Sequence, residues 1–335
     1  MNEPKRHHTA PQFYLRRFAV SDRIELVDRN DLSRRFVSSV VNALAHNNFY
    51  TIPDENDAPD PALEKFYDRS VESPGAVGLS RIIDQRRSPT LPQLRAKVAR
   101  LVAFQYLRGE SSRFSTVEQY KAIVQKTARA LTPAMYKKYL SAMMGGEPSD
   151  EETQRLYEFA QDDTKYRIGV ASESLLHAQL AIHTSAAIME RLSARTWEIV
   201  EFEEPLLITG DEPVALMNDV GDPGEALGIS LAPIVAFPAD PWHAILMHLP
   251  APGRLGGRRT AKPELAHRIN RHVAFSCHRF IVQRPGKDRL NSLQLPSKAG
   301  PTETIGAYVI YRRNLSERGA TLLRHTLLGA PGVKT

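Results

Sequence analysis

The amino-acid sequence predicts an α+β fold, with N-terminal strands, a large helical middle region and a C-terminal antiparallel sheet. Short alternating or β-branched stretches lie toward both ends of the chain, and helical periodicity dominates between them. The helices form one block and do not alternate with strands as in a βαβ fold. Because the N-terminal strands can join the C-terminal sheet, we favour a single domain over residues 1–335. The alternative is a subdivision into a mainly helical part, 1–194, and a mainly β part, 195–335.

The first sixty residues are predicted to contain strands followed by a loop. Residues 13–19 are apolar and aromatic, and residues 23–28 alternate between apolar and polar side chains, so each range is expected to form a strand. Residues 34–52 contain β-branched pairs that are interrupted by asparagines. The stretch 53–61 is acidic and contains prolines, which indicates a surface loop.

The middle of the chain has apolar residues at helical spacing. Helices are expected over residues 61–83, 92–108, 117–144, 149–159 and 172–192. Pro74-Gly75 should kink or split the first helix, and Pro92 suits the first turn of the second. The third helix should end at Gly145-Gly146, because glycine readily adopts the left-handed conformation that ends helices.

After Arg195 the pattern changes to short β-type stretches that are separated by turns. Strands are expected over residues 197–202, 206–209, 214–217, 229–237, 242–249, 280–282 and 307–311, and one helix over residues 263–274. Loops are expected over residues 253–257 and 285–301, and a break between two strands at residues 238–241.

The composition is that of a soluble globular protein, with 42% hydrophobic and 24% charged residues. There is no apolar run of about 18 residues to span a membrane and no secretory signal at the N-terminus. The single cysteine, Cys277, cannot form an internal disulfide, so a reducing cytoplasm is the expected location. The formal net charge of +6 fits a nucleic-acid partner, although the scattered basic doublets also fit an ordinary solvated surface.

Several well-known catalytic motifs are absent from the sequence. It contains neither the Gly-x-Ser-x-Gly of a nucleophile elbow nor the glycine-rich loops of dinucleotide and nucleoside-triphosphate sites. No group of cysteines and histidines has the spacing of a structural zinc site. The chemistry must therefore be sought in isolated polar residues. One of them, His183, lies beside an apolar helical stripe and is more simply explained as a core histidine than as a catalyst.

The strongest candidate segment is residues 7–18, in which histidines precede a dense apolar anchor. Burial of Phe13-Tyr14-Leu15 and Phe18 is expected to hold His8 and Gln12 in fixed positions. His8 suits a metal ligand or a general base, since an unperturbed imidazole titrates at about pH 6.5, but it also suits the end of a strand. Gln12 could orient a ligand or satisfy a backbone group.

A second group of candidates consists of polar residues at expected internal positions. In the helix predicted over 92–108, Gln105 and Arg108 fall on the apolar stripe, where an arginine can bind a carboxylate or phosphate through two parallel hydrogen bonds. The alternative is a buried ion pair of Arg108 with Glu72 or Asp211. Glu72 fits a metal-binding or acid–base carboxylate, or a solvent-facing side chain. Asp211 fits a metal ligand, a residue that positions a nucleophile, or an ordinary Asx turn.

The segment His8-x-x-Pro11-x-Phe13-Tyr14-Leu15-x-x-Phe18 resembles the opening signature of domain of unknown function 4238 (DUF4238). Other pieces similar to the family pattern follow in the same order: Asn48-Phe49-Tyr50, the acidic helix around Glu64 and Glu72, Phe104-Gln105-x-x-Arg108, Thr209-x-Asp211-x-Pro213-Val214 and Phe237-Pro238. The turn Gly210-Asp211-Glu212-Pro213 replaces an expected Ser-Asp-Asn-Pro type, so Asp211 is kept and its neighbours differ. The resemblance implies a shared fold and a shared site, and it supplies no activity.

Together these residues predict a metal-dependent phosphoester hydrolase of nuclease type that acts on nucleic acid, in a setting of defence or conflict. The expected catalytic residues, which would also bind a divalent metal ion, are His8, Glu72 and Asp211. The expected substrate-binding residues are Gln12, Gln105 and Arg108. One alternative is a non-catalytic module that binds nucleic acid or another partner. The other is a pocket in which Arg108 holds a small anionic ligand.

Overall fold

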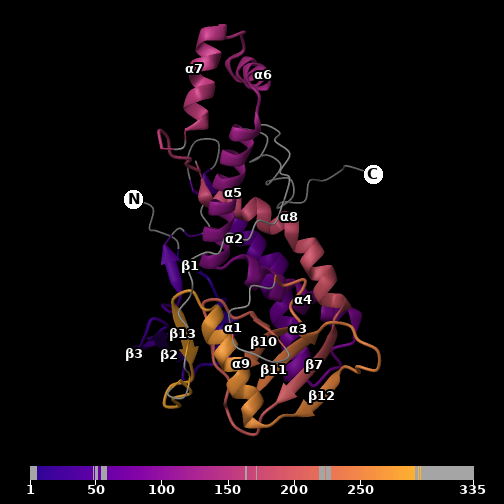
Figure 1. The fold of residues 1–335 in the computed structure, drawn as a ribbon. Coiled ribbons are helices and arrows are strands. Elements are labelled where there is room, and N and C mark those ends of the chain that lie inside the picture. Colours follow the sequence, from indigo (N-terminus) through magenta and orange to yellow (C-terminus); the bar gives the residue numbers. More distant parts are fainter. Residues whose placement is uncertain are drawn as a thin grey trace.

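The computed structural model describes residues 6–47, 49, 52–53, 59–162, 164–170, 172–218, 223, 228–290, 293 and 295. Within them, a block of helices lies between N-terminal and C-terminal strands, which confirms the predicted α+β class. The strand predicted over residues 307–311 and most of the loop predicted over 285–301 lie outside the described residues. Figure 1 shows the sheets at one end of the molecule and helices α6 (Pro133–Met144) and α7 (Asp150–Gln161) at the other.

The larger sheet has five strands in the order β12-β7-β11-β10-β9. They are β7 (Thr196–Glu201), β9 (Ala215–Met217), β10 (Ile234–Asp240), β11 (His243–His248) and β12 (Gly257–Thr260). All neighbours pair antiparallel except β12 and β7, which are parallel. The break predicted over residues 238–241 is present but shorter, because β10 continues through Pro238 to Asp240 and only Pro241 and Trp242 separate it from β11. A shift of register between Pro238 and Asp240 accommodates the proline, which has no N–H to donate.

The smaller sheet joins strands from the two ends of the chain, in the order β3-β2-β13-β8. They are β2 (Arg23–Asp28), β3 (Asp31–Ser39), β8 (Thr209–Gly210) and β13 (Phe280–Gln283). Strands β2 and β13 pair antiparallel, so N-terminal and C-terminal segments share one sheet. Two short ribbons pair β1 (Arg6–His8) with β4 (Ala45–Asn47), and β5 (Ile52–Pro53) with β6 (Pro59–Asp60).

The remaining helices follow the predicted order with different boundaries. They are α2 (Ala62–Phe66), the π-helical segment η1 (Tyr67–Glu72), α3 (Ser73–Ile83), α4 (Pro92–Leu107), α5 (Glu110–Ala130), α8 (Glu173–Ala194) and α9 (Pro263–Ser276). The helix predicted over 117–144 is two helices, because the Thr132 side chain accepts a hydrogen bond from the Met135 N–H and Pro133 starts a new first turn. Gly145 ends α6 with a φ of 70°, as predicted.

Residues 12–16 form the short helix α1 (Gln12–Arg16), so the strand predicted over residues 13–19 is wrong. Tyr14, Leu15 and Phe18 are fully buried, and their spacing places them on one face of a helical turn. The Tyr14 ring stacks on Phe237 with a centroid distance of 5.1 Å, and its hydroxyl donates to the Pro238 carbonyl at 2.7 Å. The expected apolar anchor is therefore confirmed, although it is helical.

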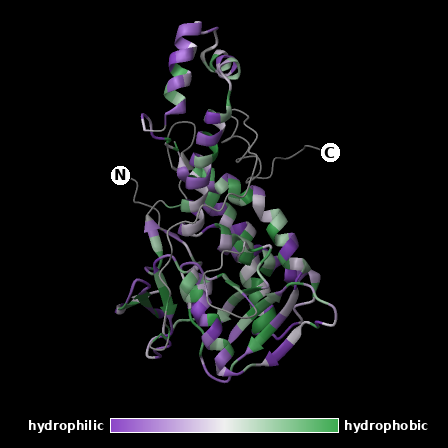
Figure 2. Cartoon of the chain, viewed as in Figure 1, coloured by the Kyte–Doolittle hydropathy of each residue, from purple (hydrophilic) through white to green (hydrophobic). Residues whose placement is uncertain are grey.

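The core lies on both faces of the larger sheet. One buried cluster joins the sheet to α3, α4 and α8, and a second joins its other face to α9. Neighbouring residues of one strand, such as Ile199 and Val200, belong to different clusters, as the alternation of a strand requires. Strands β10 and β11 are accordingly hydrophobic along most of their length (Figure 2).

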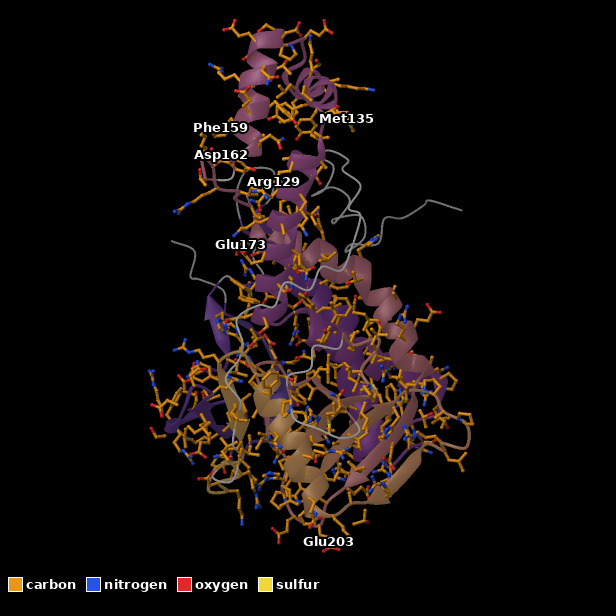
Figure 3. The ribbon with its side chains drawn as sticks, in the orientation of Figure 1. Arg129, Met135, Phe159, Asp162, Glu173 and Glu203 are labelled. Atoms are coloured by element: carbon orange, nitrogen blue, oxygen red, sulfur yellow. The ribbon has the colours of Figure 1, made fainter. Side chains whose placement is uncertain are left out.

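Helices α6 and α7 form the far end of the helical block. Figure 3 shows Met135 and Phe159 on this end and Glu203 at the opposite end of the molecule. Both Met135 and Phe159 are exposed. Across the described part of the chain, every helix is too short or too polar to cross a membrane.

Candidate functional site

Three of the predicted site residues, His8, Gln12 and Glu72, line one cavity of about 390 Å³. The cavity lies between the end of β1, the start of α1, and the run from α2 through η1 into α3. Its lining residues are His7, His8, Pro11, Gln12, Phe13, Glu64, Tyr67, Asp68, Glu72, Ser73 and Ala76. We call this cavity the histidine–carboxylate pocket. It brings together residues that lie more than sixty positions apart in the sequence.

The π-helical segment η1 supplies one wall of the pocket. A π-helix forms i→i+5 hydrogen bonds and widens the helical turn, and such segments are frequent at functional sites. Here Tyr67, Asp68 and Glu72 all reach the pocket from η1. Ser73, at the start of α3, donates a hydrogen bond to the Asp68 carboxylate at 3.2 Å.

Arg108 fixes the Glu72 carboxylate from behind the pocket. Arg108 follows α4 directly and is 0% exposed. Its Nη1 donates to Glu72 Oε1 at 2.7 Å, and its Nε donates to the Thr9 carbonyl at 2.8 Å. With its amide oriented as the hydrogen-bond network requires, buried Gln105 accepts from Arg108 Nη2 at 2.7 Å. The guanidinium also lies 5.5 Å from the centre of the Tyr67 ring.

Gln105 and Arg108 therefore point inward as predicted, but neither lines the pocket. Of the two buried pairings considered for Arg108, the structure contains the one with Glu72. Because the Arg108 donors already bind Glu72, Thr9 and Gln105, this residue holds the Glu72 carboxylate in place.

The neighbouring residues His7 and His8 lie in different environments. His8 Nε2 lies 3.0 Å from the Val41 carbonyl. A carbonyl can only accept a hydrogen bond, so Nε2 carries the proton and Nδ1 is the basic atom of the neutral ring. His7 is 4% exposed, and its Nε2 lies 3.6 Å from Glu64 Oε2. Gln12 accepts a hydrogen bond from Arg16 through its side-chain oxygen, at 3.0 Å.

Asp211 lies elsewhere and does not line the pocket. Its carboxylate accepts hydrogen bonds from three consecutive backbone N–H groups, those of His278, Arg279 and Phe280, at 2.9, 2.7 and 2.8 Å. Burial raises the pKa of Asp211, and the three N–H donors act in the opposite direction. In the structure Asp211 links the turn after β8 to the chain between α9 and β13. This contact joins segments far apart in the sequence, whereas the Asx turn considered from the sequence is local.

The three predicted metal ligands do not all lie in one place. His8 and Glu72 share the pocket, whereas Asp211 is bound to the backbone before β13. Within the residues that the structure describes, no group of three or more His, Cys, Asp and Glu side chains has an arrangement that could hold a metal ion.

Some residues of the site were missed from the sequence. Asp68 precedes Glu72 by four residues, a spacing that could have indicated a shared helical face. The buried histidine of α8 is His177, whereas His183 is exposed, so the core position expected for His183 is wrong. Burial lowers the pKa of His177 to about 4, and its ring hydrogen-bonds the Leu107 carbonyl at 2.7 Å.

Comparison with known proteins identifies one family. No curated protein matches the chain, and no solved structure matches it. The family model described as protein of unknown function (DUF4238) matches residues 6–287, a range that includes every residue of the histidine–carboxylate pocket and Asp211. The chain therefore belongs to the DUF4238 family.

Proposed function

We propose that the histidine–carboxylate pocket is the active site of a phosphoester hydrolase that acts on nucleic acid. The observation that carries the proposal is the Glu72 carboxylate, which the fully buried Arg108 holds at the wall of a pocket that also contains His8. A carboxylate and an imidazole fixed in one concave site are the groups that general acid–base catalysis uses. His8 acts as the base toward water through Nδ1, and Glu72 orients the attacking water or would help to hold a divalent cation that binds the substrate phosphate.

The charges of the pocket favour a phosphate that arrives with a divalent cation. Arg108 offsets the charge of Glu72, but Glu64 and Asp68 add two carboxylates. These carboxylates would repel a bare phosphate group. Mg²⁺ in phosphoryl-transfer sites is commonly held by one or two carboxylates together with the substrate phosphates, without a complete protein cage. Carboxylates of the pocket, Glu72 among them, would therefore hold the cation. His8 and Asp211, the other two members of the predicted ligand set, would not.

The chain as a whole supports a polyanionic substrate. Its formal net charge is +6, which favours association with nucleic acid. A cytoplasmic location, which the single cysteine favours, would give access to that substrate, and cleavage of foreign nucleic acid would fit a role in defence or conflict.

The test is cleavage of fluorescently labelled single-stranded DNA, duplex DNA and RNA by the full chain with Mg²⁺ or Mn²⁺, with and without a chelator. The critical variant is Glu72→Gln, whose amide oxygen can still accept from Arg108. We expect cation-dependent cleavage by the wild type, and at least about a 100-fold lower rate in the variant, because acid–base groups contribute roughly 10²–10⁴-fold. Equal cleavage rates for wild type and Glu72→Gln would overturn the proposal.

A matched control is Glu201→Gln. Glu201 is also a partly buried glutamate that pairs with arginines, Arg86 and Arg258, but it lies on β7 and does not line the pocket. The control variant should cleave at the wild-type rate. A wild type that retards nucleic acid in a gel without cleaving it, with or without a divalent cation, would instead favour the non-catalytic binding module. The pocket for a small anion has less support, because Arg108 does not line the cavity.

A further inference from the structure

A serine, a histidine and a glutamate meet at the start of α5, outside the histidine–carboxylate pocket. Glu110 and Ser111 are the first two residues of α5, and His278 lies between α9 and β13. Ser111 Oγ is 3.3 Å from His278 Nδ1, and His278 Nε2 is 3.0 Å from Glu110 Oε2. None of the three residues lines the pocket. The order of contacts, hydroxyl to imidazole to carboxylate, is that of an activated nucleophile with its base and orienting acid.

The proton positions in this cluster follow from the glutamate. An ionised carboxylate only accepts hydrogen bonds, so His278 Nε2 carries the ring proton and Nδ1 presents a lone pair to the Ser111 hydroxyl. The hydrogen bond from His278 lowers the pKa of Glu110, and His46, whose Nδ1 is 3.2 Å from Glu110 Oε1, lowers it further. Glu110 therefore stays ionised and keeps His278 in the tautomer that can take a proton from Ser111.

The turn after β8 holds both the nucleophile and the base. Glu212 Oε1 accepts from the Ser111 N–H at 2.7 Å, and the neighbouring Asp211 accepts from the His278 N–H at 2.9 Å. Gly109 permits this approach, because a Cβ at that position would lie 2.7 Å from the Glu212 carboxyl group. Glu212 is one of the residues at which this chain departs from the turn expected for the family. The glutamate that this chain carries at position 212 therefore makes a specific hydrogen bond, with the backbone N–H of Ser111.

We propose that Ser111, His278 and Glu110 form a second catalytic site, which hydrolyses carboxylic esters through an acyl-serine intermediate. The carboxylates of Glu110, Asp211 and Glu212 outnumber the neighbouring guanidinium of Arg279, and this excess of negative charge disfavours an anionic phosphoester and leaves an uncharged carboxylic ester acceptable. The His278 side chain is 42% exposed and Ser111 is partly exposed, so a substrate can reach both groups.

The reaction at this site has two steps. Ser111 Oγ attacks the ester carbonyl carbon, its proton passes to His278 Nδ1 and then to the departing alkoxide, and the carbon–oxygen bond to the alcohol breaks. Water then attacks the acyl-serine, giving a proton to His278. The serine oxygen leaves the carbonyl carbon and recovers that proton, so the products are an alcohol and a carboxylic acid. No oxidant or further reactant is needed.

The pH dependence of the site follows from the groups that face His278. The hydrogen bond to Glu110 raises the pKa of His278, with further contributions from the charges of Glu212 and Asp211, whereas burial acts in the opposite direction. Since only the neutral imidazole accepts the serine proton, the acylation rate should rise as pH increases through and above 6.5, the ordinary pKa of histidine.

The experiment is covalent labelling of the purified full chain with a fluorophosphonate probe, followed by mass spectrometry of the modified peptide, and hydrolysis of p-nitrophenyl acetate. The variants are Ser111→Ala and His278→Gln, and the matched control is Ser112→Ala, which changes the adjacent serine of the same helical turn. We expect one adduct, on Ser111, in the wild type and in the control, and at least a 100-fold lower labelling rate in Ser111→Ala and His278→Gln.

Two results would overturn this inference. The first is a wild type that neither labels nor hydrolyses the ester at pH 8. The second is labelling at a different residue that persists in Ser111→Ala. Because Ser111→Ala keeps the backbone N–H that binds Glu212, its melting temperature should match that of the wild type, so a loss of labelling reports chemistry and not unfolding.

Discussion

The replacement of Asp211 by alanine separates a structural role from a catalytic one. The change removes the acceptor for three backbone N–H groups in partly buried hydrogen bonds, those of His278, Arg279 and Phe280. A buried donor that loses its partner costs about 1–3 kcal/mol. Water that enters the vacated space will satisfy part of this loss, so we expect a destabilisation of about 3–6 kcal/mol in total. That amount is a large fraction of the roughly 5–15 kcal/mol by which native domains are stable.

The assay is thermal unfolding followed by circular dichroism, with urea unfolding as a second measure. For a chain of this size each kcal/mol shifts the melting temperature by about 2 °C, so Asp211→Ala should melt about 6–12 °C below the wild type. Asp31→Ala is the matched control. Asp31 accepts from the Ser33 N–H at 3.1 Å and is exposed, so water can replace its carboxylate and the shift should be much smaller.

The reasoning would be refuted by an Asp211→Ala protein that melts within about 1 °C of the wild type and loses cation-dependent cleavage. Such a result would return Asp211 to the catalytic role that the sequence suggested. A large drop in melting temperature, with cleavage retained below the new transition, would support a structural role in which Asp211 holds the chain before β13 in place.

Two further predictions concern buried residues. His177 has a pKa of about 4 in the folded protein against 6.5 when unperturbed, so the unfolded state binds a proton more readily between these values. Stability should therefore fall as pH drops from 6.5 to 4, by roughly 3 kcal/mol from this residue alone, and urea unfolding of His177→Gln should show a correspondingly smaller fall. Parallel pH curves for the two proteins would contradict this. Gly210→Ala should lower the free energy of unfolding by about 1–3 kcal/mol, because the added Cβ would meet Cys277 Sγ and lie 2.7 Å from the Phe280 carbonyl. Gly146→Ala, whose Cβ meets nothing within 4 Å, is the control, and equal melting temperatures for the two variants would contradict the steric argument.

Much of the fold could be predicted because local signals agreed with the packing. Ser149 and Ser172 cap the helices that follow them, and Pro92 begins α4, as their positions in the sequence indicate. The aromatic composition of residues 13–19 favours a strand, whereas its buried residues are spaced for one helical turn, and the segment forms α1. The Tyr14 ring stacks on Phe237, a contact between residues far apart in the chain that local sequence patterns do not contain.

The candidate site could be predicted only in part, for a geometric reason. His8 and Gln12 meet Glu72 in one pocket because Arg108 binds both the Thr9 carbonyl and the Glu72 carboxylate. The polar residues on an apolar stripe correctly indicated that Gln105 and Arg108 point inward. The sequence could not indicate which carboxylate Arg108 would bind.

The cluster at the start of α5 gave no signal at all. Ser111 and His278 lie 167 positions apart and belong to no recognisable motif. The turn after β8, which binds the backbone of both residues, and the contact of Glu110 with His278 bring them together.

The π-helical segment η1 has a consequence for how the pocket tolerates insertions and deletions. An i→i+5 hydrogen bond encloses one residue more than the bond of an α-helix. Loss of a single residue from 69–71 would let this segment close as an ordinary α-helix, in which Tyr67 and Glu72 become i and i+4 neighbours on one face. Glu72 would then keep its place beside Arg108, and α2 and α3 would persist as helices on either side. A one-residue deletion within η1 is therefore absorbed locally, whereas the same deletion within α3 or α4 would rotate the residues on one side of it by about 100° relative to the other side.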